Sequence, residues 1–154
     1  MSQWDTVSSV RDFASSKRPA RSRGPGDLRL PVTHPRLEPC PSTPNCVCSE
    51  PPGSSIEPLA YSPEGREVSE QCLLELLGWK SEFGEIITDG NIWRTVATTR
   101  LLRFKDDVAF CFDDAAQVIH VRSASRVGRY DFGANRRRIE RLRKAWVAML
   151  HAVD

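Results

Sequence analysis

Three strand-like segments joined by short turns constrain the fold of this chain more than any other feature of its sequence. Residues 92–103 are rich in β-branched side chains, residues 108–112 alternate bulky with small ones, and residues 118–123 form another β-rich run. A shorter strand is expected just before them, at residues 85–88. Strands joined by short turns pair antiparallel, because a parallel connection needs a long crossover. We therefore expect an antiparallel meander of four to five strands.

Two segments with helical patterns are expected to flank this sheet. Ser62-Pro63 is a suitable start for the first helix, and Gly78 is placed to end it. The second segment spaces its apolar residues alternately by three and four, which places one stripe against a core: Ile139, Leu142, Trp146, Met149 and Val153. The sequence therefore predicts an α+β fold of two layers, with a four- to five-stranded antiparallel meander and two flanking helices.

The N-terminal part of the chain has a different composition. Residues 1–38 combine Ser, Arg, Pro and Gly without a sustained apolar period, which predicts a disordered basic tail. Residues 39–60 contain closely spaced prolines, which preclude a helix or a central strand, so we expect an ordered Cys/Pro loop there. The remaining length suits one core, and residues 39–154 are predicted to form a single α+β domain.

Bulk composition narrows the class and the location of the protein. The chain is 40% apolar and 27% charged, as soluble globular proteins are, and no apolar run is long enough for a membrane span. The first residues lack the apolar core of a secretory signal, and Asp5, Asp12 and Asp27 weaken their likeness to a plastid transit peptide. We expect a cytoplasmic location, with the plastid as the alternative.

The net charge of +2 is unevenly distributed along the sequence. Residues 39–115 are acidic, whereas residues 116–154 are basic. This segregation favours pairing of the two regions within one fold over a basic face for nucleic acid. We therefore expect no specific nucleic-acid partner, and the pattern specifies no oligomeric state.

The most cationic stretch of the chain is VRSASRVGRYDFGANRRR, residues 121–138. It contains six arginines, and three of them, Arg136, Arg137 and Arg138, open the final helix. Cations in a first turn oppose the helix macrodipole by a few tenths to about 1 kcal/mol. We expect a carboxylate of the chain or a bound anion to offset that cost.

Two arrangements of this stretch remain open. One is an anion pocket of helix amides, hydroxyls and guanidinium groups, and the other is an internal network in which aspartates neutralise arginines. Arg122, Arg126 and Arg136 are expected to face inward, toward Asp106, Asp107 or Asp131, while Arg137, Arg141 and Lys144 are expected to be solvated. Glycines shape the backbone, and an asparagine caps the helix. The candidate ligand-binding residues are Asp106, Asp107, Arg122, Ser123, Ser125, Arg126, Gly128, Asp131, Gly133, Asn135 and Arg136.

The paired carboxylates of Asp106 and Asp107 admit two interpretations. Such pairs perform acid–base chemistry in clefts, but they also anchor structural ion pairs. Because Val108 continues directly into the expected core, we favour an anchor to the arginines. His120 alternates with Val121 on a strand, and we expect it to be half-exposed rather than a ligand.

The Cys/Pro loop places Cys40 close to Cys46 in the sequence. The two residues could form a disulfide, bind a metal, or pack as small apolar side chains. Zinc sites favour repeated cysteine pairs with shorter spacing, so we expect no metal, while the disulfide and the packed thiols remain open. Asn45 suits a turn with positive φ. We predict that Cys40, Asn45 and Cys46 form a structural loop.

Three motifs in this sequence resemble the domain-of-unknown-function family fourteen ninety-nine. They are CPSTPNCV at residues 40–47, RFKDDVAF at residues 103–110, and VRSASRVGRYDFGANRRRIE at residues 121–140. The family has no settled biochemical role, so the resemblance implies no reaction. Two residues depart from its pattern, because Cys48 and Tyr130 stand where the family usually has Ser. Tyr130 removes a small hydroxyl beside Asp131.

The sequence contains no nucleotide-binding loop and no motif of a nucleophilic hydrolase. We therefore expect a non-catalytic binding or assembly module whose arginine-rich site takes an anionic ligand or an acidic protein surface. No cofactor is expected. One alternative is an enzyme that acts on a phosphorylated or anionic small molecule through its Asp and Arg residues. Another is a redox or metal module on the Cys loop.

Overall fold

The computed structural model of the chain describes residues 36–153, so most of the expected tail lies outside the described residues. Within this range the elements are β1 (Cys46–Cys48), β2 (Leu59–Ala60), α1 (Arg66–Trp79), β3 (Ile87–Asp89), β4 (Ile92–Thr98), β5 (Lys105–Asp113), β6 (Val118–Ser125) and α2 (Ala134–Val153). Neither described helix is long and apolar enough to cross a membrane.

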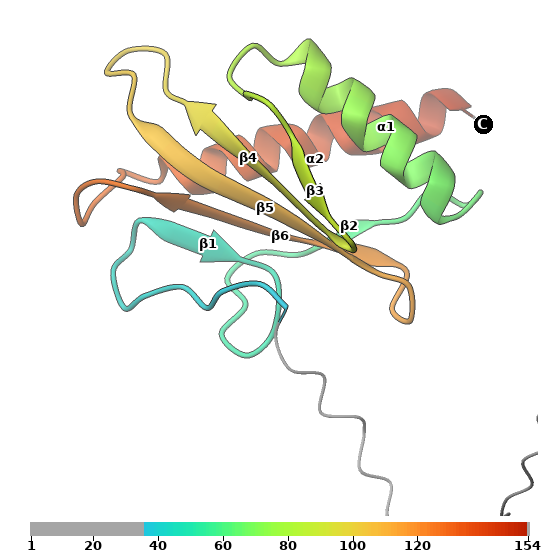
Figure 1. Cartoon of the computed structure of the whole chain (residues 1–154), viewed down its shortest axis with the longest axis horizontal. Helices are drawn as coiled ribbons and strands as arrows, with labels where there is room; N and C mark the ends of the chain where they lie inside the picture. Colours follow the sequence, from blue (N-terminus) through green and yellow to red (C-terminus); the bar gives the residue numbers. More distant parts are fainter. Residues whose placement is uncertain (1–35, 154) are drawn as a thin grey trace, which may run out of the picture. The chain divides into compact units, whose positions relative to one another are not determined.

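The strands form one antiparallel sheet. Their order across the sheet is β1-β6-β5-β4-β3, and β2 also pairs with β6. Strands β3 to β6 are consecutive in the chain and neighbours in the sheet, as a meander requires. Both helices cover the same face of the sheet (Figure 1). The predicted α+β fold is therefore confirmed.

The core lies between the sheet and the two helices. Alternation along β5 turns every second side chain toward the helices, and the apolar ones are fully buried there: Val108, Phe110 and Phe112. The expected stripe of α2 meets them with Ile139, Leu142 and Trp146, all buried. Helix α1 adds Cys72, Leu73, Leu76 and Leu77. Period-two and helical spacings thus converge on one apolar layer.

The opposite face of the sheet is partly covered by the chain that precedes β1. Leu37 is buried there in a small cluster with Cys48 and Cys111. Arg36 donates to Asp113 Oδ2 at 2.7 Å, so the described domain includes residues ahead of the expected boundary at residue 39. This cover also explains why His120 is buried and not half-exposed as expected.

The first helix begins later than the sequence suggested. Gly65 precedes it with φ of 100°, a backbone conformation that helices do not contain, so the helix starts at Arg66. Ser62 lies in the preceding turn, where its carbonyl oxygen accepts a hydrogen bond from the Gly65 amide at 2.9 Å. Gly78 does not end the helix, which continues to Trp79. The predicted cap and stop were therefore both wrong.

The Cys/Pro loop contains two short strands, which were not predicted from the sequence because of the prolines in this segment. β1 pairs Cys46 with Ala124 and Cys48 with Arg122, and β2 pairs Leu59 with Ile119. Both pair with β6, and β1 is the first strand in the order across the sheet. The prolines flank these strands and do not interrupt them, which agrees with the rule that proline avoids central strands.

Candidate functional site

A buried ion pair lies beneath the first turns of α2. Arg138 Nη2 is 2.6 Å from Asp106 Oδ2, and the two side chains are 3% and 2% exposed. The other guanidinium nitrogens of Arg138 donate to Asn135 Oδ1 at 2.9 Å, to Ser123 Oγ at 3.3 Å and to Glu82 Oε2 at 3.3 Å. Every nitrogen of this guanidinium therefore has a partner, as burial of a charge requires.

Asn135 connects this pair to the rest of the cationic stretch. Its side-chain amide donates to Asp131 Oδ2 at 2.8 Å, to Ser125 Oγ at 2.9 Å and to the Asn45 carbonyl oxygen at 3.2 Å. Its Oδ1 accepts from Ser123 Oγ at 2.6 Å. Asn135 is fully buried, so it joins α2, β6 and the Cys loop in one closed network.

Asp131 satisfies the N-terminus of α2. Its carboxylate accepts hydrogen bonds from the Gly133 amide and the Asn135 amide, each at 2.9 Å. Burial opposes ionisation, but the hydrogen bonds from Asn135 and Gly133 outweigh it and lower the pKa of Asp131. The chain's own carboxylate thus occupies the place where an anion was considered, and Asp131 takes the capping role expected of Asn135.

Two glycines give this loop its path. Gly128 and Gly133 have φ of 82° and 76°, in the left-handed region that favours glycine. The Gly128 carbonyl oxygen accepts from Asn45 Nδ2 at 2.7 Å. A Cβ added to Gly133 would be strained by the positive φ, and the Arg137 guanidinium, 3.1 Å away, would have to shift slightly. Both glycines therefore have a structural role, which is to allow the backbone conformation of this loop.

The three arginines expected to face inward have different positions. Arg126 pairs with Asp107 at 2.7 Å, but the side chains are 44% and 54% exposed. Arg136 is exposed and donates to the Ser55 carbonyl oxygen at 2.9 Å, so the expectation that it meets an aspartate is wrong. Arg138 takes the inward position instead.

Arg122 lies on the opposite face of the sheet, because its neighbours Val121 and Ser123 point into the core. Its side chain is 12% exposed, and Nη2 is 3.7 Å from Glu38 Oε2. The buried Nε has no hydrogen-bond partner among residues 36–153. Arg122 is therefore separated by the sheet from the network around Asn135.

The Cys loop is closed by a disulfide between Cys40 and Cys46. Asn45 is buried beside it, but its φ is not positive, so the predicted turn conformation is wrong and its role lies in hydrogen bonding. The Asn45 carbonyl oxygen also accepts from the Ser125 amide at 3.0 Å. Within residues 36–153 no group of three or more His, Cys, Asp or Glu side chains is arranged to hold a metal ion.

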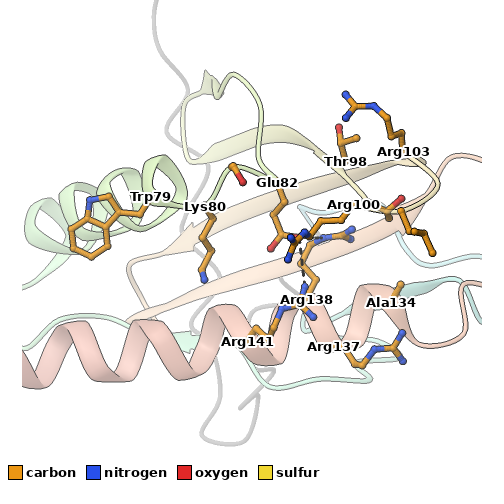
Figure 2. Close-up of a pocket in the computed structure, with 13 residues that line it drawn as sticks. Trp79, Lys80, Glu82, Thr98, Arg100, Arg103, Ala134, Arg137, Arg138 and Arg141 are labelled. Atoms are coloured by element: carbon orange, nitrogen blue, oxygen red, sulfur yellow. Dashed lines mark hydrogen bonds and ion pairs between the residues drawn. The ribbon is translucent and has the colours of Figure 1, made fainter.

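A cationic pocket of about 880 Å³ lies on the helix side of the molecule, and we call it the cation pocket. It is bordered by the end of α1, the β4–β5 loop and the first half of α2. Figure 2 shows Lys80 extending toward α2, from which Arg138 and Arg141 project. Its lining comprises Trp79, Lys80, Ser81, Glu82, Thr98, Thr99, Arg100, Leu101, Arg103, Ala134, Arg137, Arg138 and Arg141.

Glu82 is the one carboxylate among the described residues that line the cation pocket. It contacts Arg138 at 3.3 Å and Arg141 at 3.6 Å, so its single charge is shared between two guanidinium groups. Lys80, Arg100, Arg103 and Arg137 have no ion-pair partner among residues 36–153. The pocket therefore carries excess positive charge.

The chain belongs to a family described as protein of unknown function (DUF1499), whose model matches residues 36–146. This is the family that the three sequence motifs indicated. Neither the curated proteins nor the solved structures contain a match to the chain. The family's description names no ligand and no reaction.

Proposed function

We propose that this protein is a non-catalytic binding module that holds an anionic ligand or an acidic partner surface in the cation pocket. The observation that carries the proposal is the imbalance of charge there. Six cationic side chains line the pocket, and Glu82 is the single carboxylate among the lining residues. Asp106 neutralises one of the six, Arg138, so the imbalance rests on the other five. Clustered like charges destabilise a fold by mutual repulsion, and an anion bound between them would relieve it.

The composition of the pocket fits phosphate or carboxylate groups. Guanidinium groups offer planar forks of donors that match these anions, and a lysine adds a mobile point charge. The cations come from three separate elements, with Lys80 following α1, Arg100 on the β4–β5 loop and Arg141 on α2. A ligand bound there would cross-link these elements, which makes its binding visible as added stability.

The alternative of an Asp-based enzyme has less support. Asp106 is buried against Arg138, Asp107 is exposed on the other face of the sheet, and Asp131 caps α2. Acid–base catalysis by a carboxylate pair requires that both groups reach one substrate. These three carboxylates are engaged separately and do not share a cleft.

The alternative of a redox module also has less support. Cys40 and Cys46 are joined to each other, and the free thiols of Cys48, Cys72 and Cys111 are buried. Burial raises the pKa of Cys48 above its usual value and that of Cys111 to about 11. Thiols with raised pKa are poor nucleophiles at neutral pH.

The disulfide bears on the location of the protein. Disulfides persist in oxidising compartments and are rare in the cytosol. In place of the cytoplasmic location expected from the sequence, we propose an oxidising compartment, which the Cys40–Cys46 bond supports. Acid quenching of host cells, followed by alkylation under denaturing conditions, should leave these two cysteines unmodified. Alkylation of all five cysteines would contradict the proposal.

Anion binding is tested by thermal unfolding with inorganic phosphate or pyrophosphate at constant ionic strength, with chloride as the reference anion. We expect phosphate to raise the melting temperature of the parent, but not that of Arg137→Ala/Arg141→Ala. The matched control is Arg94→Ala/Arg129→Ala, which removes two exposed arginines outside the cation pocket. The control should respond as the parent does. An equal response of all three proteins would refute a specific site.

A further inference from the structure

Two loops expose most of the large apolar side chains that this domain leaves in water. Six of the ten exposed large apolar side chains among the described residues belong to the β4–β5 loop (residues 99–104) or the β6–α2 loop (residues 126–133). We call these two segments the tip loops. Their exposed residues are Leu101 (90%), Leu102 (66%), Phe104 (52%), Val127 (72%), Tyr130 (72%) and Phe132 (89%).

The tip loops leave the sheet at the same end. β5 and β6 pair antiparallel, with Asp106 opposite Ser125, so the start of β5 lies beside the end of β6. The Arg126 amide donates to the Lys105 carbonyl oxygen at 3.2 Å, which ties the bases of the two loops together. Figure 1 shows both loops projecting from this end of the sheet. Their apolar side chains therefore belong to one region of the surface.

Cations alternate with these apolar side chains. The β4–β5 loop reads TRLLRF and contains no acidic residue, and the β6–α2 loop reads RVGRYDFG. Its one acidic residue, Asp131, is engaged by the amides of α2. Lys105 directly follows the first loop, and Arg137 in the first turns of α2 donates to the Phe132 carbonyl oxygen of the second. The region therefore combines exposed apolar surface with positive charge.

We propose that the tip loops dock on a membrane surface rich in anionic phospholipid. Apolar side chains inserted at the headgroup boundary and cations facing anionic headgroups add to binding, and tyrosine favours this boundary. Arginine and aromatic side chains are also common at protein interfaces, so self-association through the tip loops is tested in the same experiment.

The cation pocket lies directly beside this surface. Arg100, Leu101 and Arg103 belong to a tip loop and also line the pocket. Binding of a lipid headgroup in the cation pocket rests on the proposed function. Insertion of the tip loops into a membrane does not depend on that function. Anion binding by the pocket and membrane insertion of the tip loops can therefore be refuted independently.

The experiment measures co-sedimentation of the full chain with vesicles of phosphatidylcholine alone or mixed with phosphatidylglycerol. The tip variant Leu102→Asn/Phe132→Asn removes two exposed apolar side chains outside the pocket lining, and asparagine tolerates the positive φ of Phe132. The control Leu74→Asn/Val147→Asn removes two exposed apolar side chains from the helices. Residues 1–35 are present in every protein, so differences belong to the substituted loops.

We expect the parent and the control to bind the anionic vesicles and not phosphatidylcholine alone, and the tip variant to bind at least about tenfold more weakly. Equal binding by parent and tip variant, or no vesicle binding by the parent, would overturn the proposal. A concentration-dependent dimer that the tip variant abolishes, without vesicle binding, would assign the loops to self-association instead. A phosphate-dependent rise in melting temperature that the tip variant retains would keep the pocket intact whatever the vesicles show.

Discussion

Asp106 and Asp107 are neighbours in β5, yet they form two different ion pairs. Asp106 lies 2.6 Å from Arg138, and Asp107 lies 2.7 Å from Arg126. The first pair is almost completely buried, whereas about half of each side chain in the second is exposed. Two pairs of the same chemistry and nearly the same length therefore occupy opposite faces of one sheet.

The difference teaches that distance alone does not measure the contribution of an ion pair. Exposed pairs are screened by water and salt and stabilise little. A buried pair adds little beyond an apolar replacement, but removal of one partner leaves a charge without solvent or counter-charge. Strand alternation produces this contrast, because successive side chains point to opposite faces. Stability should therefore respond to Arg138 and hardly to Arg126.

The largest expected effect is that of Arg138→Ala. It would leave the Asp106 carboxylate buried without its partner. It would also remove the hydrogen bonds that Arg138 donates to Asn135 Oδ1 and Ser123 Oγ. We expect the free energy of unfolding to fall by about 3–5 kcal/mol, as measured by urea denaturation. The double variant Asp106→Leu/Arg138→Met should recover much of this loss, since no charge remains buried. A loss of under about 1 kcal/mol for Arg138→Ala would remove the contrast between the two pairs.

The second effect concerns the disulfide beside the buried network. Cys46 is adjacent to Asn45, whose carbonyl oxygen accepts a hydrogen bond from Asn135. Loss of the disulfide would therefore weaken the contact between the Cys loop and the buried network. Replacement of Cys40 and Cys46 by serine should lower the free energy of unfolding by about 2 kcal/mol, because the closed loop is short. Thiol titration of the unreduced, denatured parent should find three free cysteines. Five would show that the bond is absent.

The third effect is pH-dependent. Asp131→Ala removes the cap of the helix that carries Arg138 and should cost about 1 kcal/mol near neutral pH. Because the folded state lowers the pKa of Asp131, its contribution is complete above the unfolded pKa of about 4 and is lost as pH falls through the lower folded pKa. The stability gap between parent and variant should therefore narrow in acid. A gap that stays constant down to the acid transition would contradict this role.

The fourth effect is small by comparison. Arg126→Ala breaks the exposed pair with Asp107 and leaves that carboxylate in water. We expect its urea midpoint to match that of Arg129→Ala, which removes another exposed arginine of the same loop. The sequence alone had suggested an inward position and hence a large cost. A loss close to that of Arg138→Ala would show that exposure does not separate the two pairs.

Local patterns sufficed to predict the layers of the fold. Alternation in residues 108–112 identified the buried side of β5, and the spacing of Ile139, Leu142 and Trp146 identified the buried side of α2. The short edge strand Cys46–Cys48 could not be predicted in the same way. Its pairing depends on β6, which lies far along the chain, and its own segment is dominated by prolines.

The partner of Asp106 could also have been read from the sequence. Arg138, Leu142 and Trp146 recur every four residues, so Arg138 continues the buried stripe of α2. The charge pattern of the first turn had instead suggested Arg136 as the inward-facing arginine, but Arg136 is exposed. The cation pocket offers no such signal, because Lys80 and Arg100 lie in separate segments that only the tertiary path of the chain brings to α2.

The smallest expected effect on stability is that of Arg137→Ala, which tests whether the exposed cations serve binding. Arg137 is exposed in the first turns of α2, and its Nη1 donates to the Phe132 carbonyl oxygen at 2.5 Å. Loss of this hydrogen bond opposes the gain from removing a cation near the positive end of the helix dipole. We expect the free energy of unfolding to change by under about half a kcal/mol, while the phosphate-dependent rise in melting temperature is reduced. Arg136→Ala, one residue earlier and outside the cation pocket, should keep that rise. If Arg137→Ala keeps it as well, the unpaired cations are a solvated surface, and the contrast between the two ion pairs concerns stability alone.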